Sequence, residues 1–135
     1  MGEIYSLVTI TNFADPTKTM KFQALVDTSA SYLTLPDTWK EQLGHLALLE
    51  SVELETATQA KIAGEVCGPV KIQVEGFRPI ASEVLFIEMN PEDGNYEPLV
   101  DHLVLQQAGI AIDMLGHRLM KGRALLKRFS IEEGK

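Results

Sequence analysis

The chain has 135 residues, of which 45% are hydrophobic and 23% charged, so its composition is that of an ordinary globular protein. This length suits one domain, and we expect a single domain over residues 1–135. The 19 acidic residues outnumber the 12 basic ones, which gives a formal net charge of -7. Nucleic acid is therefore an unexpected partner, because phosphate contacts need a basic protein face.

The single cysteine, Cys67, excludes an intramolecular disulfide and a zinc site built from several thiolates. We expect Cys67 to be a half-buried strand residue in a protein of the reducing cytoplasm. No apolar run approaches the roughly 20 residues that span a bilayer, so no membrane partner is expected. The N-terminus also lacks the basic and apolar regions of a signal peptide.

Short β-branched and apolar runs, separated by Gly, Pro and Asp turns, predict a mostly β protein with one or two short helices. In the first half of the chain we expect a hairpin over residues 4–26 with strands 5–11 and 20–26, a strand over 32–35 and a helix over 38–43. A strand over 52–56, with Val and Leu on one face and Glu on the other, and a long bent hairpin over 61–76 follow. The remaining expected elements are a strand over 84–87, a helix over 101–108, a hairpin with strands 110–112 and 118–120, and a final strand over 125–131.

The two helices have recognisable ends. Asp37 is expected to cap the first helix, and Gly44 to end it. In the second helix, Leu103, Val104 and Leu105 are expected to face the core. Gly109 ends that helix, because a left-handed residue commonly closes the last turn. Trp39, on the first helix, is expected to belong to the core.

The segment Ala24-Leu-Val-Asp-Thr-Ser-Ala-Ser31 carries the chemistry of this sequence. Its acidic residue, Asp27, directly follows an apolar strand and opens a loop of small residues. Backbone N–H groups of a tight loop can hold a charged carboxylate, and small neighbours let a substrate backbone approach. Such a segment can present one carboxyl at the floor of a cleft, although Asp after a strand is also a common turn former.

This segment, followed by Leu33-Thr-Leu-Pro36, resembles the active-site segment of retropepsin-like aspartic proteases, whose pattern is two apolar residues, Asp, Thr or Ser, Gly, Ala, and Ser or Thr. A later block, Glu97 to Leu105 followed by Ala108 to Asp113, resembles the second block of the same family, and Arg118-Leu119 continues it. The order and spacing are those of a single-domain, bacterial-type member. The resemblance spans residues 4–121 and implies a closed, orthogonal β-barrel.

The resemblance further implies an aspartic endopeptidase that works as a homodimer on a peptide or protein substrate, without metal or cofactor. Asp27 of each subunit would supply one carboxyl of a dyad that shares a proton and activates water. Thr28, Ser29 and Ala30 would support the dyad, with Thr28 bonding across it to the other subunit's backbone. A hairpin within residues 56–75 stands in the place of the family's flap.

The sequence departs from the family pattern at two positions. Ser29 stands where the family has Gly. A left-handed backbone conformation at Ser29 would destabilise the fold by on the order of 1 kcal/mol, and the Cβ of Ser29 would narrow the cleft. We therefore expect Ser29→Gly to raise activity. Asp101 replaces the Gly of the second-block turn, Leu99-Val100-Asp101. Its carboxylate is expected either to be solvated at a helix N-terminus or to lie close enough to Asp27 to affect its titration.

The histidines and serines of the chain offer no second kind of catalytic or metal site. His45, His102 and His117 lack the close spacing of metal ligands and are expected at the surface or in turns. Ser29 and Ser31 lack the Gly-x-Ser-x-Gly elbow of serine hydrolases. The remaining alternative to a protease is a catalytically silent relative that keeps the dimeric cleft to bind a peptide or protein partner.

Overall fold

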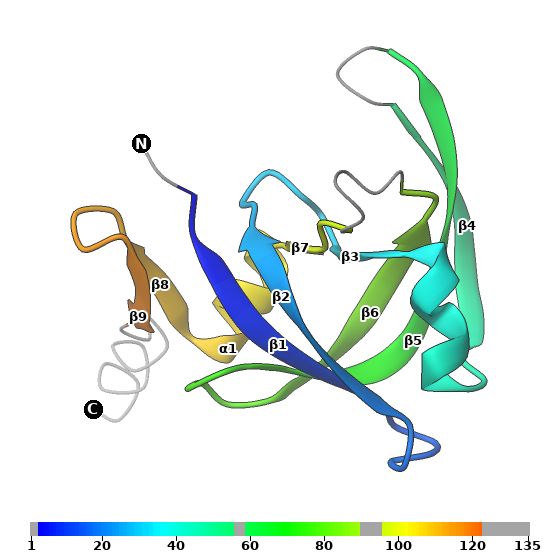
Figure 1. Ribbon diagram of the computed structural model, residues 1–135, viewed down its shortest axis with the longest axis horizontal. Helices are drawn as coiled ribbons and strands as arrows, with labels where there is room; N and C mark the ends of the chain where they lie inside the picture. Colours follow the sequence, from blue (N-terminus) through cyan, green and yellow to red (C-terminus); the bar gives the residue numbers. More distant parts are fainter. Residues whose placement is uncertain (1–2, 56–58, 90–95, 123–135) are drawn as a thin grey trace, which may run out of the picture.

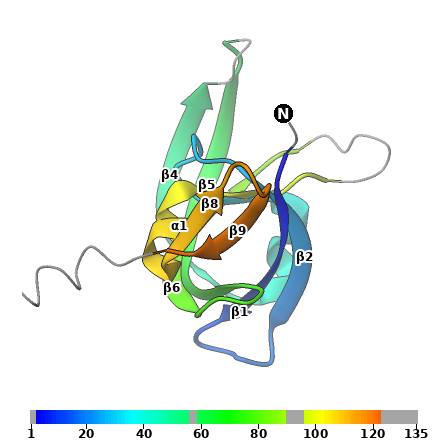
Figure 2. The ribbon, with the colours of Figure 1, turned by 90° about the vertical axis from the view of Figure 1, so that its left-hand side faces the viewer.

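The computed structural model describes residues 3–55, 59–89 and 96–122. Seven strands form one sheet in the order β1-β2-β7-β3-β6-β5-β4, and a further pairing of β1 with β5 closes the first six into a barrel. The strand β4 lies outside this closure and pairs with β5 (Figures 1 and 2). The elements are β1 (Tyr5–Asn12), β2 (Thr19–Val26), β3 (Leu33–Pro36), η1 (Asp37–Leu43), β4 (Ala47–Glu55), β5 (Lys61–Val74), β6 (Ile80–Ile87), β7 (Leu99–Val100), α1 (His102–Ala108), β8 (Ile110–Asp113) and β9 (Arg118–Lys121).

The predicted N-terminal hairpin is confirmed as the antiparallel pair β1–β2. Val8 and Ile10 of β1 face the barrel interior and are fully buried, because alternate side chains of a strand point to the same face. The buried amide of Asn12 follows them and donates hydrogen bonds to the backbone carbonyls of Leu43 (2.7 Å) and His45 (2.8 Å). The end of β1 is thereby fastened to the end of η1.

The bent hairpin expected within residues 61–76 is wrong, since this stretch is one continuous 14-residue strand, β5. Its bend coincides with a register shift against β6 between Cys67 and Val70. A Cβ at Gly64 would approach Leu85 Cδ1 to 2.9 Å, so this glycine allows β5 and β6 to lie close together. The hairpin partner of β5 is β4, which begins earlier than the predicted strand and alternates as expected over its last residues.

Both predicted helices are present, with changes at their starts and faces. The first is a 3-10 helix whose N-cap is Pro36, so the prediction of Asp37 as the cap is wrong; Gly44 closes it at φ 68°. In α1, Val104 and Leu105 are buried as expected, but Leu103 is 46% exposed. The helix has seven residues, so its buried face is narrow, and Ala108 completes it.

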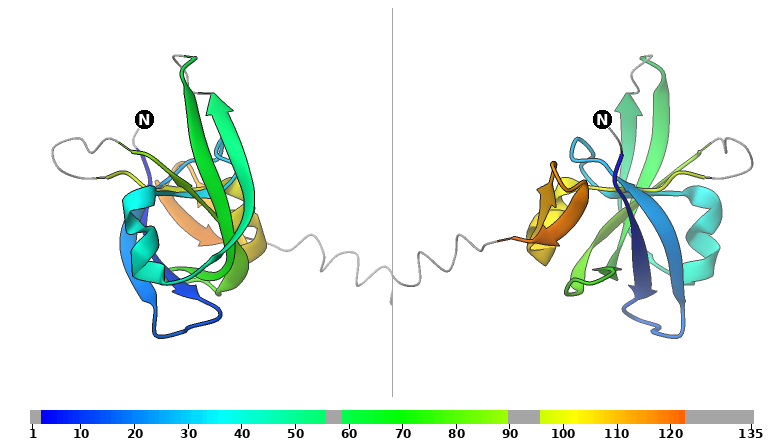
Figure 3. Two further views of the ribbon diagram at one scale, coloured as in Figure 1. Left: turned by 90° about the vertical axis from the view of Figure 1, so that its right-hand side faces the viewer. Right: turned by 60° about the vertical axis from the view of Figure 1, so that its left-hand side comes forward.

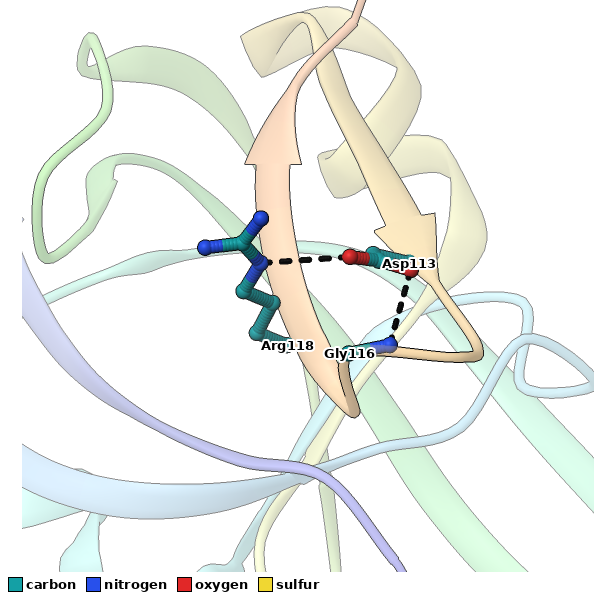
Figure 4. A network of polar contacts seen from close by, with 3 residues as sticks. All are labelled: Asp113, Gly116 and Arg118. Carbon is teal, nitrogen blue, oxygen red and sulfur yellow. Dashed lines mark hydrogen bonds and ion pairs between the residues drawn. The ribbon is translucent and has the colours of Figure 1, made fainter.

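The second predicted hairpin is confirmed as β8–β9, a separate two-stranded sheet. Its turn is held by Asp113, whose Oδ1 accepts the backbone N–H of Gly116 (2.9 Å) and whose Oδ2 pairs with Arg118 Nε (3.2 Å) (Figure 4). These donors, the Gly116 N–H first, lower the pKa of Asp113. The final strand predicted over residues 125–131 lies outside the described residues.

The core fills the barrel and extends under η1 and α1. Cys67 is fully buried instead of half-buried, because its side chain belongs to the hydrophobic core, and burial raises the pKa of its thiol. Trp39 packs against the core from η1 but remains partly exposed. Among the described residues, no helix is long and apolar enough to cross a membrane.

Candidate active site

The segment after β2 is positioned by an unusual strand order. The two residues of β7 insert between β2 and β3, pairing parallel with Leu25 and Val26 and antiparallel with Thr34. The backbone hydrogen bonds between β2 and the β7 segment continue past the end of β2: Leu25 N donates to Pro98 O and Asp27 N donates to Val100 O, each at 2.9 Å. The backbone of Asp27 is therefore fixed by a strand that is distant in the sequence.

The Asp27 side chain is half-buried at this strand end. Its Oδ1 accepts two hydrogen bonds from Ser29, one from the backbone N–H at 3.0 Å and one from the hydroxyl at 2.6 Å. The backbone turn is closed by Ala30 N, which donates to Asp27 O at 3.1 Å. Oδ2 accepts no hydrogen bond from the described part of the chain, so one carboxylate oxygen is anchored and the other is available to a partner.

The strain that a left-handed Ser29 would carry does not arise. Among the described residues, Gln59 and His117 are the only ones besides glycines with positive φ. Ser29 thus fits its loop with an ordinary backbone and adds a hydroxyl donor that glycine lacks. Thr28 is exposed and Ala30 is half-buried, so the three predicted support residues all lie in the turn around the Asp27 carboxylate.

Asp101 occupies the N-cap position of α1, but its expected solvation is wrong. The residue is 2% exposed, its side chain makes no capping hydrogen bond, and Oδ1 has no hydrogen-bond partner. Burial raises the pKa of Asp101, opposed by nearby backbone N–H groups that include those of Val104 and Leu103. Asp101 lies between Val100, a fully buried residue of the inserted strand, and a helix that buries Val104 and Leu105. Leu99, at the start of that strand, is half-buried.

A cavity of about 390 Å³ lies beside the Asp27 carboxyl. It is lined by Glu3, Ile4, Leu25, Val26, Asp27, Thr28, Ile112 and Met114. Apolar walls with few polar groups are typical of ligand sites. Sequence analysis missed Glu3, Ile112 and Met114 as wall residues. The available signal was the apolar pair Met114-Leu115 in a turn, where polar residues are usual; these side chains are 64% and 101% exposed.

The hairpin β4–β5 stands away from the barrel at the end where the 27–31 loop lies (Figure 1). The predicted flap region, residues 56–75, contains the β5 arm of this hairpin. The β4 arm, Ala47–Glu55, lies before that region; the sequence predicted its end, as the strand over 52–56, but not its first residues, which lack clean alternation. Residues 56–58 lie outside the described residues.

The three histidines are exposed, as expected, and they lie on separate elements. Within residues 3–55, 59–89 and 96–122, no group of three or more His, Cys, Asp or Glu side chains could hold a metal ion. His117 Nε2 lies 2.8 Å from the backbone carbonyl of Glu3, which joins the β8–β9 turn to the start of the chain.

Comparisons with known proteins give a structural likeness only. No family model matches the sequence, and no curated protein matches it. Among solved structures, the chain is similar to the EIAV protease complexed with the inhibitor HBY-793, with a TM-score of 0.60 and 17% sequence identity. The match covers 84% of this chain and 94% of that one. The protein therefore has a retropepsin-like fold, a closed and mostly β barrel with two short helices.

Proposed function

We propose that this protein is an aspartic endopeptidase that works as a homodimer, with Asp27 of each subunit forming a shared-proton dyad. The observation that carries the proposal is the Asp27 carboxyl, whose Oδ1 accepts two hydrogen bonds from Ser29, in a residue that lines a mostly apolar cavity. The retropepsin-like fold supports it, since the comparable solved structure is a protease bound to an inhibitor. The substrate is a peptide or protein, and the chemistry needs no metal or cofactor.

The reaction follows from two carboxyls that are too close to ionise together and so share one proton. The ionised carboxyl accepts a proton from water as the oxygen of that water attacks the scissile carbonyl carbon. The protonated carboxyl donates to the developing oxyanion. Thr28 and Ala30 complete the turn that keeps Asp27 in place, and the β4–β5 hairpin would add strand-like hydrogen bonds to a bound peptide.

The proposal takes the second carboxyl from another chain, because Asp101, the aspartate at the end of the neighbouring strand, is 2% exposed. An isologous interface brings the same loop of both subunits to a two-fold axis. Two exposed apolar side chains, Met114, which lines the cavity, and its neighbour Leu115, are suited to such an interface.

The test is hydrolysis of a mixed peptide pool between about pH 3 and pH 7 by the parent protein and by Asp27→Asn. We expect cleavage by the parent and a loss of at least about a thousandfold in the variant, because an amide can neither accept nor donate the shared proton. Circular dichroism and light scattering should show that the variant keeps its fold and dimer. Equal turnover by both proteins would reject the proposal, and peptide binding without cleavage by the parent would favour the silent relative.

A further inference from the structure

A second cavity, of about 450 Å³, is lined in part by the segment that leads into β7. It is lined by Tyr5, Phe22, Gln23, Trp39, Tyr96, Glu97 and Pro98. These residues come from β1, β2, η1 and the residues before β7, which lie near one another in Figure 3. We refer to this cavity as the aromatic pocket.

The ring stacking in the aromatic pocket gives it a defined shape. Trp39 lies 5.5 Å from Phe22 in a tilted arrangement and 5.9 Å from Tyr96 in an edge-to-face arrangement, measured between ring centroids. Such pairs are the preferred aromatic geometries. Aromatic ring faces attract cations through their quadrupole, with Trp the strongest of the side chains.

One carboxylate, that of Glu97, lines the pocket, and a second, that of Glu3, contacts the hydroxyl of Tyr5, which also lines it. The hydroxyl of Tyr5 lies 3.1 Å from Glu3 Oε1 and 3.3 Å from Glu97 Oε2. The Tyr5 hydroxyl has one proton and donates it to only one carboxylate at a time, so the other carboxylate keeps a free acceptor oxygen. Among the described residues, neither glutamate forms an ion pair, and no lysine or arginine lines the pocket. Aromatic rings and uncompensated negative charge together favour a cationic guest.

We propose that the aromatic pocket binds an arginine or lysine side chain of the peptide substrate, outside the residues that flank the scissile bond. This inference rests on the proposed peptidase function for its placement along a substrate. Gln23, which lines the pocket, precedes Asp27 by four residues on β2, which corresponds to roughly 13 Å of strand. An extended peptide covers this distance in about four residues, so we place the basic residue three or four positions from the scissile bond. Glu3 connects the two sites, because it lines the Asp27 cavity and its Oε1 contacts the hydroxyl of Tyr5, which lines the aromatic pocket.

The experiment measures peptide binding to full-length Asp27→Asn protein, so that hydrolysis does not interfere. Trp39 is the only tryptophan of the chain and lines the pocket, so its fluorescence reports occupancy directly. The probes are two capped eight-residue peptides that differ only in one residue, arginine or its uncharged isostere citrulline. We expect the arginine peptide to change the fluorescence with a Kd about tenfold lower than that of the citrulline peptide.

The pocket is then tested by Glu97→Gln, which removes its charge and keeps its size. The matched control is Glu83→Gln, which makes the same charge change on β6, away from the pocket. We expect Glu97→Gln to reduce the arginine preference to about threefold or less, and Glu83→Gln to preserve it. Tyr5→Phe, which frees both carboxylates, serves as a second pocket variant and should keep or strengthen the preference.

Equal affinities for the two peptides, or equal losses in the two glutamine variants, would overturn the pocket proposal. Binding of the arginine peptide by Asp27→Asn, together with absence of cleavage by the parent, would uphold the pocket and reject the peptidase. Cleavage of the peptide pool without any arginine preference would reject the pocket alone.

Discussion

Two carboxyls lie at the ends of neighbouring parallel strands in this protein, and their surroundings differ. Asp27 follows β2 and Asp101 follows β7, whose residues pair in register as Leu25 with Leu99 and Val26 with Val100. The Asp27 carboxyl is half-buried, and its Oδ1 accepts two hydrogen bonds from Ser29. The Asp101 carboxyl is 2% exposed, and its Oδ1 has no partner.

The difference comes from the segment that the chain enters after each strand. After Asp27 the chain makes a short turn of small residues, whose N–H and hydroxyl groups point back to the carboxylate. After Asp101 the chain enters a helix whose buried residues include Val104 and Leu105. The first setting suits a reactive carboxylate, and the second disfavours its charged form.

The largest expected contrast is in activity. We expect Asp27→Asn to abolish peptide hydrolysis and Asp101→Asn to retain it within about twofold, because a buried carboxyl does not reach the substrate. Initial rates on the same peptide, at equal concentrations of folded dimer, measure this contrast. Loss of hydrolysis in both variants, with both folded, would show that the two carboxyls act as one site.

Mixing subunits tests whether the second carboxyl comes from another chain. With about a ninefold excess of Asp27→Asn chains, random pairing leaves about one parent chain in ten with a parent partner, so activity per parent chain falls about tenfold. Dilution of the parent below its dissociation constant should lower the specific rate in the same way. Activity that is unaffected by mixing or dilution would point to a monomer in which Asp101 is the second carboxyl.

Ser29 should contribute a smaller effect. The Ser29 hydroxyl donates a hydrogen bond to Asp27 Oδ1 at 2.6 Å. Because a hydrogen bond to a charged group stabilises that group, Ser29→Ala should lower kcat, by about tenfold or less. Ser29→Thr, which keeps a hydroxyl, should restore part of the rate. Ser29→Gly, expected from the sequence to raise activity, removes the Cβ as well as the hydroxyl, so comparison with Ser29→Ala distinguishes the effect of the Cβ from that of the hydroxyl. A Ser29→Gly rate above that of the parent would show that the Cβ obstructs the cleft.

The smallest effect concerns stability. Because burial raises the pKa of Asp101 in the folded state, the folded chain binds more protons than the unfolded chain between the unfolded and the folded pKa values. The contribution of Asp101 to the free energy of unfolding is therefore greatest below the unfolded pKa and is lost as pH rises through the folded pKa.

Asp101→Asn lacks this loss, so the free energy of unfolding of the variant should rise relative to that of the parent as pH increases, until Asp101 is fully ionised in the folded parent. Urea unfolding at a series of pH values measures it. Asp37→Asn, which removes an exposed carboxylate, is the control for the change in net charge. A difference from the parent that is constant with pH would contradict the buried-carboxyl account.

The sequence alone determined the strand-rich class, the N-terminal hairpin, both short helices and the β8–β9 hairpin, because these depend on local apolar patterns and on turn residues such as Gly44 and Gly109. It also singled out Asp27 and its loop, since a carboxylate among small residues after an apolar strand is visible in one short segment. Catalysis by Asp27 stays a prediction.

Only the tertiary structure decided what surrounds each carboxyl. The insertion of β7 between β2 and β3 joins residues about 70 positions apart, and no local pattern in the sequence encodes that pairing. Asp101 is buried at the end of the inserted strand, whereas the sequence had led us to expect it either in solvent at a helix N-terminus or close to Asp27, and Leu103 is exposed instead of buried. The ordinary backbone of Ser29 depends likewise on how its loop is fastened to β7. Burial and backbone conformation at these positions are set by contacts between distant segments, so they follow from the closed barrel.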